Sequence, residues 1–144
     1  MTTDRRNFLR QSTLGACAVI TGISALTSGC STLPLVKVKP ESNELKVLAS
    51  QFGEGNNLLV RTPEFEFDIL LHREKSDSYT ALLMQCSHQN QPLTFSSGQI
   101  YCPSHGSTFS LEGHVTKAPA TQDLKKYSTR ISADEQTVFI QLNS

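Results

Sequence analysis

Short runs of apolar residues alternate with polar residues over most of the chain after residue 43, and Gly, Pro, Asn and Asp separate the runs. The clearest run is FEFDILL, in which Phe65, Phe67 and Ile69 occupy every second position. A period of two is typical of a half-buried strand. Further runs of strand character cover residues 44–49, 57–62, 79–85, 98–102, 107–111, 125–132 and 137–142. No segment after residue 30 has the length and period of a helix.

Strands this short, spaced about ten residues apart, predict an all-β fold, a small antiparallel sandwich or barrel. The segment 32–43 is expected to be a tether that runs into a first strand, with Pro40 and Asn43 as breakers. The apolar residues near the end of the chain are expected to be core: Leu124, Tyr127, Phe139, Ile140 and Leu142.

The first thirty residues follow a different pattern. A short polar start holds Arg5 and Arg6, followed by Asn-Phe-Leu-Arg, and no charged residue occurs between Arg10 and Lys37. This segment resembles a twin-arginine export signal, with Asp4 in place of the usual Ser or Thr. Its apolar part is shorter than the roughly 20 apolar residues of a spanning helix. We therefore expect a cleaved signal rather than a membrane anchor. An ordinary amphipathic helix would explain neither the arginine pair nor the charge-free run.

The signal segment ends in LTSGC. Gly29-Cys30 resembles the end of a bacterial lipobox, in which the cysteine is lipidated and becomes the first residue of the mature protein, although Thr27 stands where Leu is usual. Acyl chains on Cys30 would hold the protein at a membrane surface, at about 0.8 kcal/mol per buried methylene. Residues 1–29 are thus interpreted as a signal, 30–43 as a tether with the first strand, and 44–144 as the folded domain.

Length and charge limit the possible partners. The 144 residues carry 13 Lys or Arg and 13 Asp or Glu without any block of like charge, so nucleic acid is not expected as a partner. A chain of this length has room for one modest domain and none for a separate catalytic domain.

Two cysteine and histidine pairs carry the candidate chemistry. Cys86 and His88 are two residues apart, and Cys102 and His105 are three apart. Thiolates and imidazoles are metal ligands, and the spacing alone fits either one ion or two adjacent ions. A disulfide between the two cysteines is the remaining alternative, and it would leave both histidines without a role.

The residues around these pairs make a comparison specific. Cys86-Ser-His88 and Cys102-Pro-Ser-His105-Gly-Ser resemble the two cluster-binding loops of the Rieske iron-sulfur proteins, and the similarity extends from about residue 35 to 142. The later segment EGHVTKAPATQDLKKY, with Pro119, looks like the loop that covers the cluster in that family. The resemblance implies a Rieske-type sandwich or barrel with a cluster-binding subdomain of two loops. It also implies a 2Fe-2S cluster whose buried iron is held by the two cysteines and whose outer iron is held by the two histidines.

Ligation of this mixed kind would set the reduction potential. Two ferric ions, two sulfides and two thiolates make a neutral oxidised cluster, which accepts an electron more readily than an all-cysteine cluster. Ser107 is a candidate donor to a bridging sulfide, but Phe109 stands where high-potential relatives have a tyrosine donor. Gln91 and Ser104 occupy the places of a disulfide clamp in those relatives. We therefore expect a potential in the lower part of the range of roughly −150 to +300 mV.

The other two histidines are not expected to be ligands. His114 is interpreted as an exposed loop residue, and His72 as a surface residue at the end of a strand.

Three classes of function remain open. The first is an exported one-electron carrier, or the iron-sulfur subunit of a redox complex, in the periplasm or anchored to a bacterial membrane by lipid on Cys30. Its partners would be redox proteins, a donor and an acceptor, and we do not expect an enzyme that acts alone. The second is a structural zinc module with two cysteine and two histidine ligands. The third is the Rieske ferredoxin component of an oxygenase system. Such components normally work in the cytoplasm, so the arginine pair argues against the third class.

Overall fold

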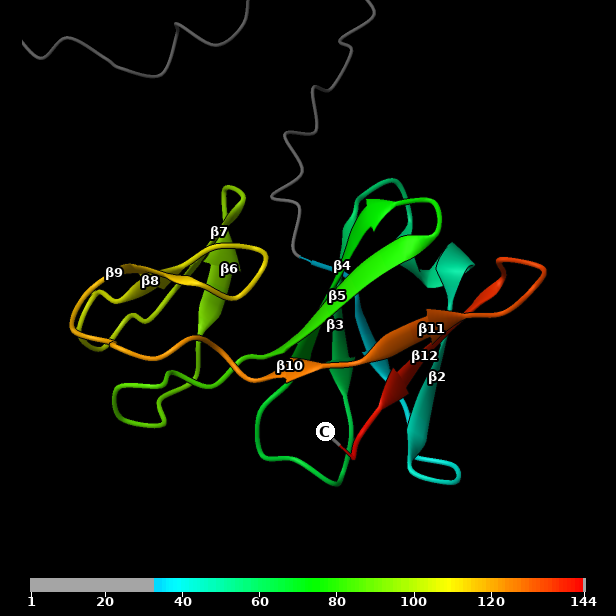
Figure 1. Cartoon of the computed structure of the whole chain (residues 1–144), viewed down its shortest axis with the longest axis horizontal. Coiled ribbons are helices and arrows are strands. Elements are labelled where there is room, and N and C mark those ends of the chain that lie inside the picture. The colour runs from blue at the N-terminus through cyan, green and yellow to red at the C-terminus, as the bar shows by residue number, and fades with distance from the viewer. Residues whose placement is uncertain (1–32, 144) are drawn as a thin grey trace, which may run out of the picture. The chain divides into compact units, whose positions relative to one another are not determined.

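Twelve short strands and one 3-10 helix form the regular structure of residues 33–143, the part of the chain that the computed structural model describes (Figure 1). Their bounds are β1 Leu35–Lys37, β2 Glu44–Leu48, η1 Ala49–Phe52, β3 Asn57–Arg61, β4 Ile69–Lys75, β5 Ser78–Leu83, β6 Thr94–Ser96, β7 Gln99–Tyr101, β8 Thr108–Phe109, β9 Val115–Lys117, β10 Lys126–Tyr127, β11 Thr129–Ile131 and β12 Thr137–Gln141. The all-β prediction is confirmed. The predicted signal with Arg5 and Arg6, and the predicted lipidation site Cys30, lie outside the described residues. Within residues 33–143 no helix has the length and apolar character needed to cross a bilayer.

The strands form three sheets. One has five strands in the order β1-β3-β4-β5-β10, a second has the order β11-β12-β2, and a third has the order β6-β7-β8-β9. All neighbouring strands pair antiparallel except β1 and β3, which run parallel with Leu35 opposite Leu59. The exception arises because the chain leaves β1, contributes β2 to the second sheet, and returns to the first sheet in its original direction.

The centre of the five-stranded sheet is buried on both faces. Successive strand residues point to opposite faces, and in β4 Ile69 and Leu71 enter one hydrophobic core while Leu70 enters another. The first, here called the base core, joins this sheet to the three-stranded sheet through residues such as Leu45 and Ile140. The second, the loop core, contains Leu70, Leu82, Met84, Cys86, Leu93, Ile100, Cys102, Phe109, Ala120 and Leu124. Both candidate cysteines therefore pack in the loop core, on the face of the five-stranded sheet that bears Leu70 and Leu82.

This two-sided burial corrects one prediction. The alternation in FEFDILL predicted a half-buried strand from Phe65, but β4 begins only at Ile69, and Leu70 is 0% exposed. Phe65 and Phe67 precede the strand and pack partly buried against the base core. A strand that is covered on both faces has a continuous run of apolar residues instead of an alternating pattern. In β4 this run is Ile69-Leu70-Leu71.

Most of the core predictions hold, with one correction. Tyr127, Ile140 and Leu124 are buried, and Leu142 packs partly buried against the base core. Phe139 is only half-buried, because Val138 and Ile140 on either side of it fill the core and the pleat turns it outward. Its ring is covered instead by the Arg130 guanidinium, 3.6 Å from the ring centroid.

Candidate metal centre

The first candidate loop follows β5 and is closed by two backbone hydrogen bonds. The N–H of Cys86 donates to the carbonyl of Gln91 at 2.8 Å, and the N–H of Asn90 donates to the carbonyl of Cys86 at 2.9 Å. Asn90 has φ of 52°, a left-handed conformation that Asn tolerates better than most residues. The cysteine thus starts a tight turn that points His88 outward, where it is exposed.

The second candidate loop lies between β7 and β8 and repeats the same pattern. The N–H of Cys102 donates to the carbonyl of Ser107 at 2.8 Å, and the N–H of Gly106 donates to the carbonyl of Cys102 at 2.9 Å. Gly106 has φ of 77°, at the position equivalent to Asn90. The two loops therefore share one pattern of backbone hydrogen bonds, and each begins with a cysteine.

The four candidate ligands fall into an inner pair and an outer pair. Cys86 and Cys102 are each 1% exposed and form no disulfide, whereas His88 and His105 are exposed. The two imidazole rings lie edge to face, with centroids 5.1 Å apart. The structure thus brings together the four residues that the sequence had paired.

The surroundings of Cys102 favour a thiolate. Burial alone would raise the pKa of its thiol. Four hydrogen bonds outweigh this effect and lower the pKa below its usual value: two from the backbone N–H groups of Ser104 and His105, one with the Cys86 thiol and one with the Ser104 hydroxyl. Thiolates are the form in which cysteines bind iron. Ser104, at the place of the absent disulfide clamp, contributes one of these donors.

A third loop, residues 118–125 between β9 and β10, closes over the other two. The Ser107 hydroxyl oxygen accepts a hydrogen bond from the N–H of Ala120 at 3.0 Å, and Ser107 is fully buried. The Ser87 hydroxyl donates to the carbonyl of Gln122 at 2.5 Å. Each candidate loop is thus tied to the segment that contains Pro119, which is exposed and follows a cis peptide bond. Sequence analysis missed Ser87, and Ala120 and Gln122 take part through backbone atoms, which give no side-chain signal.

Phe109 and Gly113 pack the base of the loops. Phe109 is 1% exposed in β8, opposite Ile100, and belongs to the loop core together with both cysteines. Gly113 has φ of 97°, and a Cβ atom there would lie 2.8 Å from the Cδ2 atom of Leu82. The left-handed conformation therefore favours glycine at this position, and a Cβ atom would also require the Leu82 side chain to shift.

The remaining histidines lie elsewhere. His114 is exposed, as predicted, and its Nδ1 atom lies 2.7 Å from Asp123 Oδ2. His72 was expected at the end of a strand, but it lies inside β4, partly buried, with Nδ1 2.8 Å from Asn57 Oδ1. That prediction is wrong because the strand continues to Lys75.

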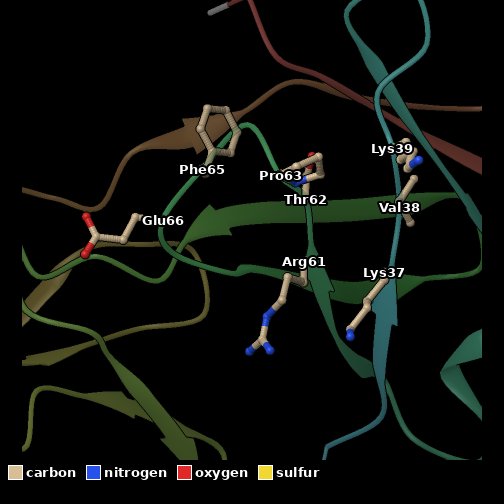
Figure 2. A pocket seen from close by; sticks show the side chains of 8 residues that line it. All are labelled: Lys37, Val38, Lys39, Arg61, Thr62, Pro63, Phe65 and Glu66. Carbon is tan, nitrogen blue, oxygen red and sulfur yellow. The ribbon is translucent and has the colours of Figure 1, made fainter.

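A groove of about 440 Å³ lies beside β1 and the segment after β3. Figure 2 shows the side chains that line it: Lys37, Val38, Lys39, Arg61, Thr62, Pro63, Phe65 and Glu66. None of the predicted site residues lines this groove.

The donor set fits a two-iron cluster. Among residues 33–143, no group of three or more His, Cys, Asp or Glu side chains is placed to hold one metal ion. A Rieske-type cluster asks for only two protein ligands per iron. The buried cysteines and the exposed histidines supply two such pairs, and the donors around Cys102 suit a thiolate.

Comparison with known proteins agrees with this arrangement. The family model described as "Rieske [2Fe-2S] domain" matches residues 43–128, more than half of the chain. Members of that family bind a 2Fe-2S cluster. No curated protein sequence shows significant similarity to the chain.

Three solved structures illustrate the similarity of fold. The plasma membrane Rieske protein PetC3 from the cyanobacterium Synechocystis PCC 6803 is 26% identical, with a TM-score of 0.51 over 60% of this chain and 86% of that one. A complex of reduced oxygenase and oxidized ferredoxin in carbazole 1,9a-dioxygenase is 20% identical, with a TM-score of 0.54 over 71% and 95%. The quaternary ammonium Rieske monooxygenase CntA is 19% identical, with a TM-score of 0.52 over 67% of this chain and only 30% of that one. The last two similarities show the fold alone.

Proposed function

Because the chain belongs to the Rieske [2Fe-2S] domain family, we propose that it is an exported, membrane-tethered one-electron carrier or the iron-sulfur subunit of a redox complex. Its ligands in this proposal are Cys86 and Cys102 for the inner iron and His88 and His105 for the outer iron. When bound, the cluster supplies reversible one-electron transfer. A structural zinc module is set aside, because the family that the chain belongs to is defined by an iron-sulfur domain.

The observation that carries the proposal is that the two proposed cysteine ligands are buried while the two proposed histidine ligands are exposed. The cysteines are 1% exposed, whereas both histidines are exposed with rings 5.1 Å apart. The outer pair therefore forms the edge at which a partner can approach. An imidazole at this edge keeps a second ring nitrogen toward solvent, where it can hold or release a proton.

The other predicted residues would stabilise the centre. Ser107 is buried beside the second loop, and its oxygen already accepts the N–H of Ala120, so its own proton is left to donate toward the cluster. Phe109 fills the loop core without any donor of its own. Pro119 lies in the segment that the two serine hydrogen bonds hold against the ligand loops.

Export and anchoring rest on the sequence before the described domain. Arg5 and Arg6 match a route that carries folded proteins, which suits a cluster inserted before export. Lipid on Cys30 would hold the domain at the membrane, with residues 30–43 as tether and first strand and 44–144 as the domain. The similarity to a plasma membrane Rieske protein supports a membrane location.

Spectroscopy of the purified protein tests the proposal. We expect a coloured protein with about two irons and two sulfides per chain and, after reduction, the electron paramagnetic resonance signal of a Rieske cluster. A colourless protein that retains one zinc ion per chain would overturn it.

A further inference from the structure

The groove beside β1 and the segment after β3 lies apart from the proposed metal centre, because none of its lining residues belongs to a ligand loop. Val38 and Phe65 give it apolar surface, and both pack partly buried against the base core. Lys37 lies opposite Arg61 in the register of β1 and β3, and Figure 2 shows their side chains next to each other, pointing the same way. The groove therefore combines apolar surface with a cationic rim.

Two of the cations at this groove have no carboxylate partner. Lys37 and Lys39 are exposed, and within residues 33–143 neither forms an ion pair. Arg61 is paired with Asp68 at 2.7 Å and therefore contributes less positive potential. Glu66 is the only carboxylate among the lining residues. The groove is thus locally positive, although the same part of the chain has more acidic than basic residues in total.

β1 also exposes an apolar side chain. Leu35 is 41% exposed, and it precedes Lys37 by two residues, so both side chains leave the same face of the strand. Apolar side chains enter the headgroup region of a bilayer, while the ammonium groups of lysines stay at the level of the lipid phosphates. An exposed leucine beside unpaired lysines therefore suits the surface of an anionic membrane.

The place of β1 in the chain brings this face within reach of a membrane. In the proposed anchored protein the lipid is on Cys30, and five residues of chain lead from it to Leu35. A chain of that length spans at most about 18 Å. Lys37 and Lys39 follow within four residues. The anchor thus keeps these lysines close to lipid headgroups, where each lysine strengthens binding to an anionic surface about fivefold.

A peptide strand is a less suitable partner for this edge. β1 is the outer strand of the five-stranded sheet, so its free edge has backbone groups with which another strand could pair. Pro34 and Pro40 flank the strand, and Lys37 stands at its end. Prolines and lysines are the residues with which edge strands avoid such pairing. They do not hinder contact with a lipid surface, and the lysines favour it.

We infer that the β1 edge, defined as residues 34–39 with the groove beside it, docks on an anionic phospholipid surface. This inference rests on the proposed function, because it takes Cys30 as the anchor. A lipid anchor alone leaves the domain free to turn, whereas a second contact fixes which side of the domain faces the membrane. The contact thus limits the orientations in which the carrier meets a redox partner in the same membrane.

Photo-cross-linking of the lipid-anchored, cluster-loaded protein in vesicles tests the contact. A photoreactive amino acid replaces Pro63, which is exposed at the groove, or, as control, Leu48, which is 51% exposed in β2 of the second sheet. In vesicles of about equal parts phosphatidylglycerol and phosphatidylcholine, we expect at least about fivefold more lipid adduct from position 63 than from position 48. The excess should disappear in phosphatidylcholine alone, and also near 1 M salt, at which the Debye length is about 3 Å.

Lysine variants show whether charge causes the contact. Lys37→Gln combined with Lys39→Gln should lower the adduct from position 63 by about fivefold or more. Lys75→Gln combined with Lys126→Gln makes the same change of net charge elsewhere, at the end of β4 and in β10 at the opposite edge of the sheet. This control should alter the yield by less than about twofold, because charges beyond a Debye length are screened from the contact.

Three results would overturn the inference: equal lipid adducts from both positions, equal adducts in neutral and anionic vesicles, or adducts from position 63 to a second protein chain. Flotation with phosphatidylcholine vesicles and mass spectrometry of Cys30 report the anchor separately. If Cys30 carries no lipid, the proposed anchor fails, and flotation with the anionic vesicles then decides the inference, since it should still depend on Lys37 and Lys39. Flotation that does not depend on them would overturn it. Loss of the Rieske signal in the wild-type protein would instead overturn the proposed cluster.

Discussion

The hydroxyl oxygen of Ser107 accepts the backbone N–H of Ala120 at 3.0 Å, inside the protein and thirteen residues further along the chain. This one contact joins the second ligand loop to the third loop. Ser87 makes the corresponding contact from the first ligand loop, since its hydroxyl donates to the carbonyl of Gln122. The two serines differ in one respect that matters for stability: Ala120 is 3% exposed, whereas Gln122 lies at the surface.

Ser107→Ala should lower the free energy of unfolding by about 1–3 kcal/mol, because it leaves a buried N–H without an acceptor. Ser87→Ala is the matched control. The carbonyl of Gln122 can turn to water, so the loss there should stay below about 1 kcal/mol. Urea unfolding of the two variants measures both values. Equal losses, or a larger loss in Ser87→Ala, would mean that the Ser107 contact does not hold the third loop.

Alanine at any one of Cys86, His88, Cys102 or His105 should abolish the Rieske signal, because one iron would then keep a single protein ligand. His114→Ala is the control, since His114 is exposed and its ring contacts Asp123. Electron paramagnetic resonance and iron content of the five variants decide the assignment residue by residue. An unchanged signal in one of the first four would remove that residue from the ligand set.

The pair of Asp123 and His114 makes part of the stability depend on pH. Hydrogen bonds from His114 and from the N–H of Val115 lower the pKa of the Asp123 carboxyl below its usual value of 3.8. A depressed folded-state pKa stabilises the protein above the unfolded-state value, and this contribution disappears as the pH falls through the folded-state pKa. Asp123→Asn should therefore be less stable than wild type near neutral pH and equally stable in strong acid. Unfolding curves at a series of pH values test this, and a difference that persists in acid would contradict it.

Export depends on residues before the described domain. Lysine at both Arg5 and Arg6 keeps the charge but should retain the precursor inside the cell. Cys30→Ala should still be exported but should take up no labelled fatty acid. Cell fractionation and labelling measure the two effects separately. Normal export of the lysine variant would favour the general secretory route, and labelled Cys30→Ala would exclude the lipidation site.

The all-β fold could be predicted from the short runs of strand character, and it is confirmed. Cys86, His88, Cys102 and His105 remain predicted ligands, proposed because metal ligands leave a short, local signature; the structure places both cysteines in one core and the two imidazole rings side by side. The half-buried state of Phe139 and the start of β4 at Ile69 were missed. Both depend on which faces of a strand other elements cover, and a single strand's pattern does not contain that information.

The contacts between loops were beyond sequence reasoning for a different reason. Ser107 bonds a backbone N–H thirteen residues away, and Ser87 a carbonyl thirty-five residues away. Backbone groups are the same at every position, so only the folded chain shows which of them meet.

Phe109→Tyr tests the electronic role of the loop core. The ring is 1% exposed and shares the loop core with both cysteines, so a hydroxyl added to it can reach a ligand sulfur or stay buried without an acceptor. In the first case it stabilises the more negative reduced state. A hydrogen bond worth on the order of 1 kcal/mol then raises a one-electron potential by some tens of millivolts, since 59 mV corresponds to about 1.4 kcal/mol. Ser107→Ala should lower the potential by a similar amount. Protein-film voltammetry at one pH measures all three proteins. An unchanged potential in Phe109→Tyr, together with a loss of stability of about 1–3 kcal/mol, would show that the hydroxyl is buried unpaired and that the ring faces away from the ligand sulfurs.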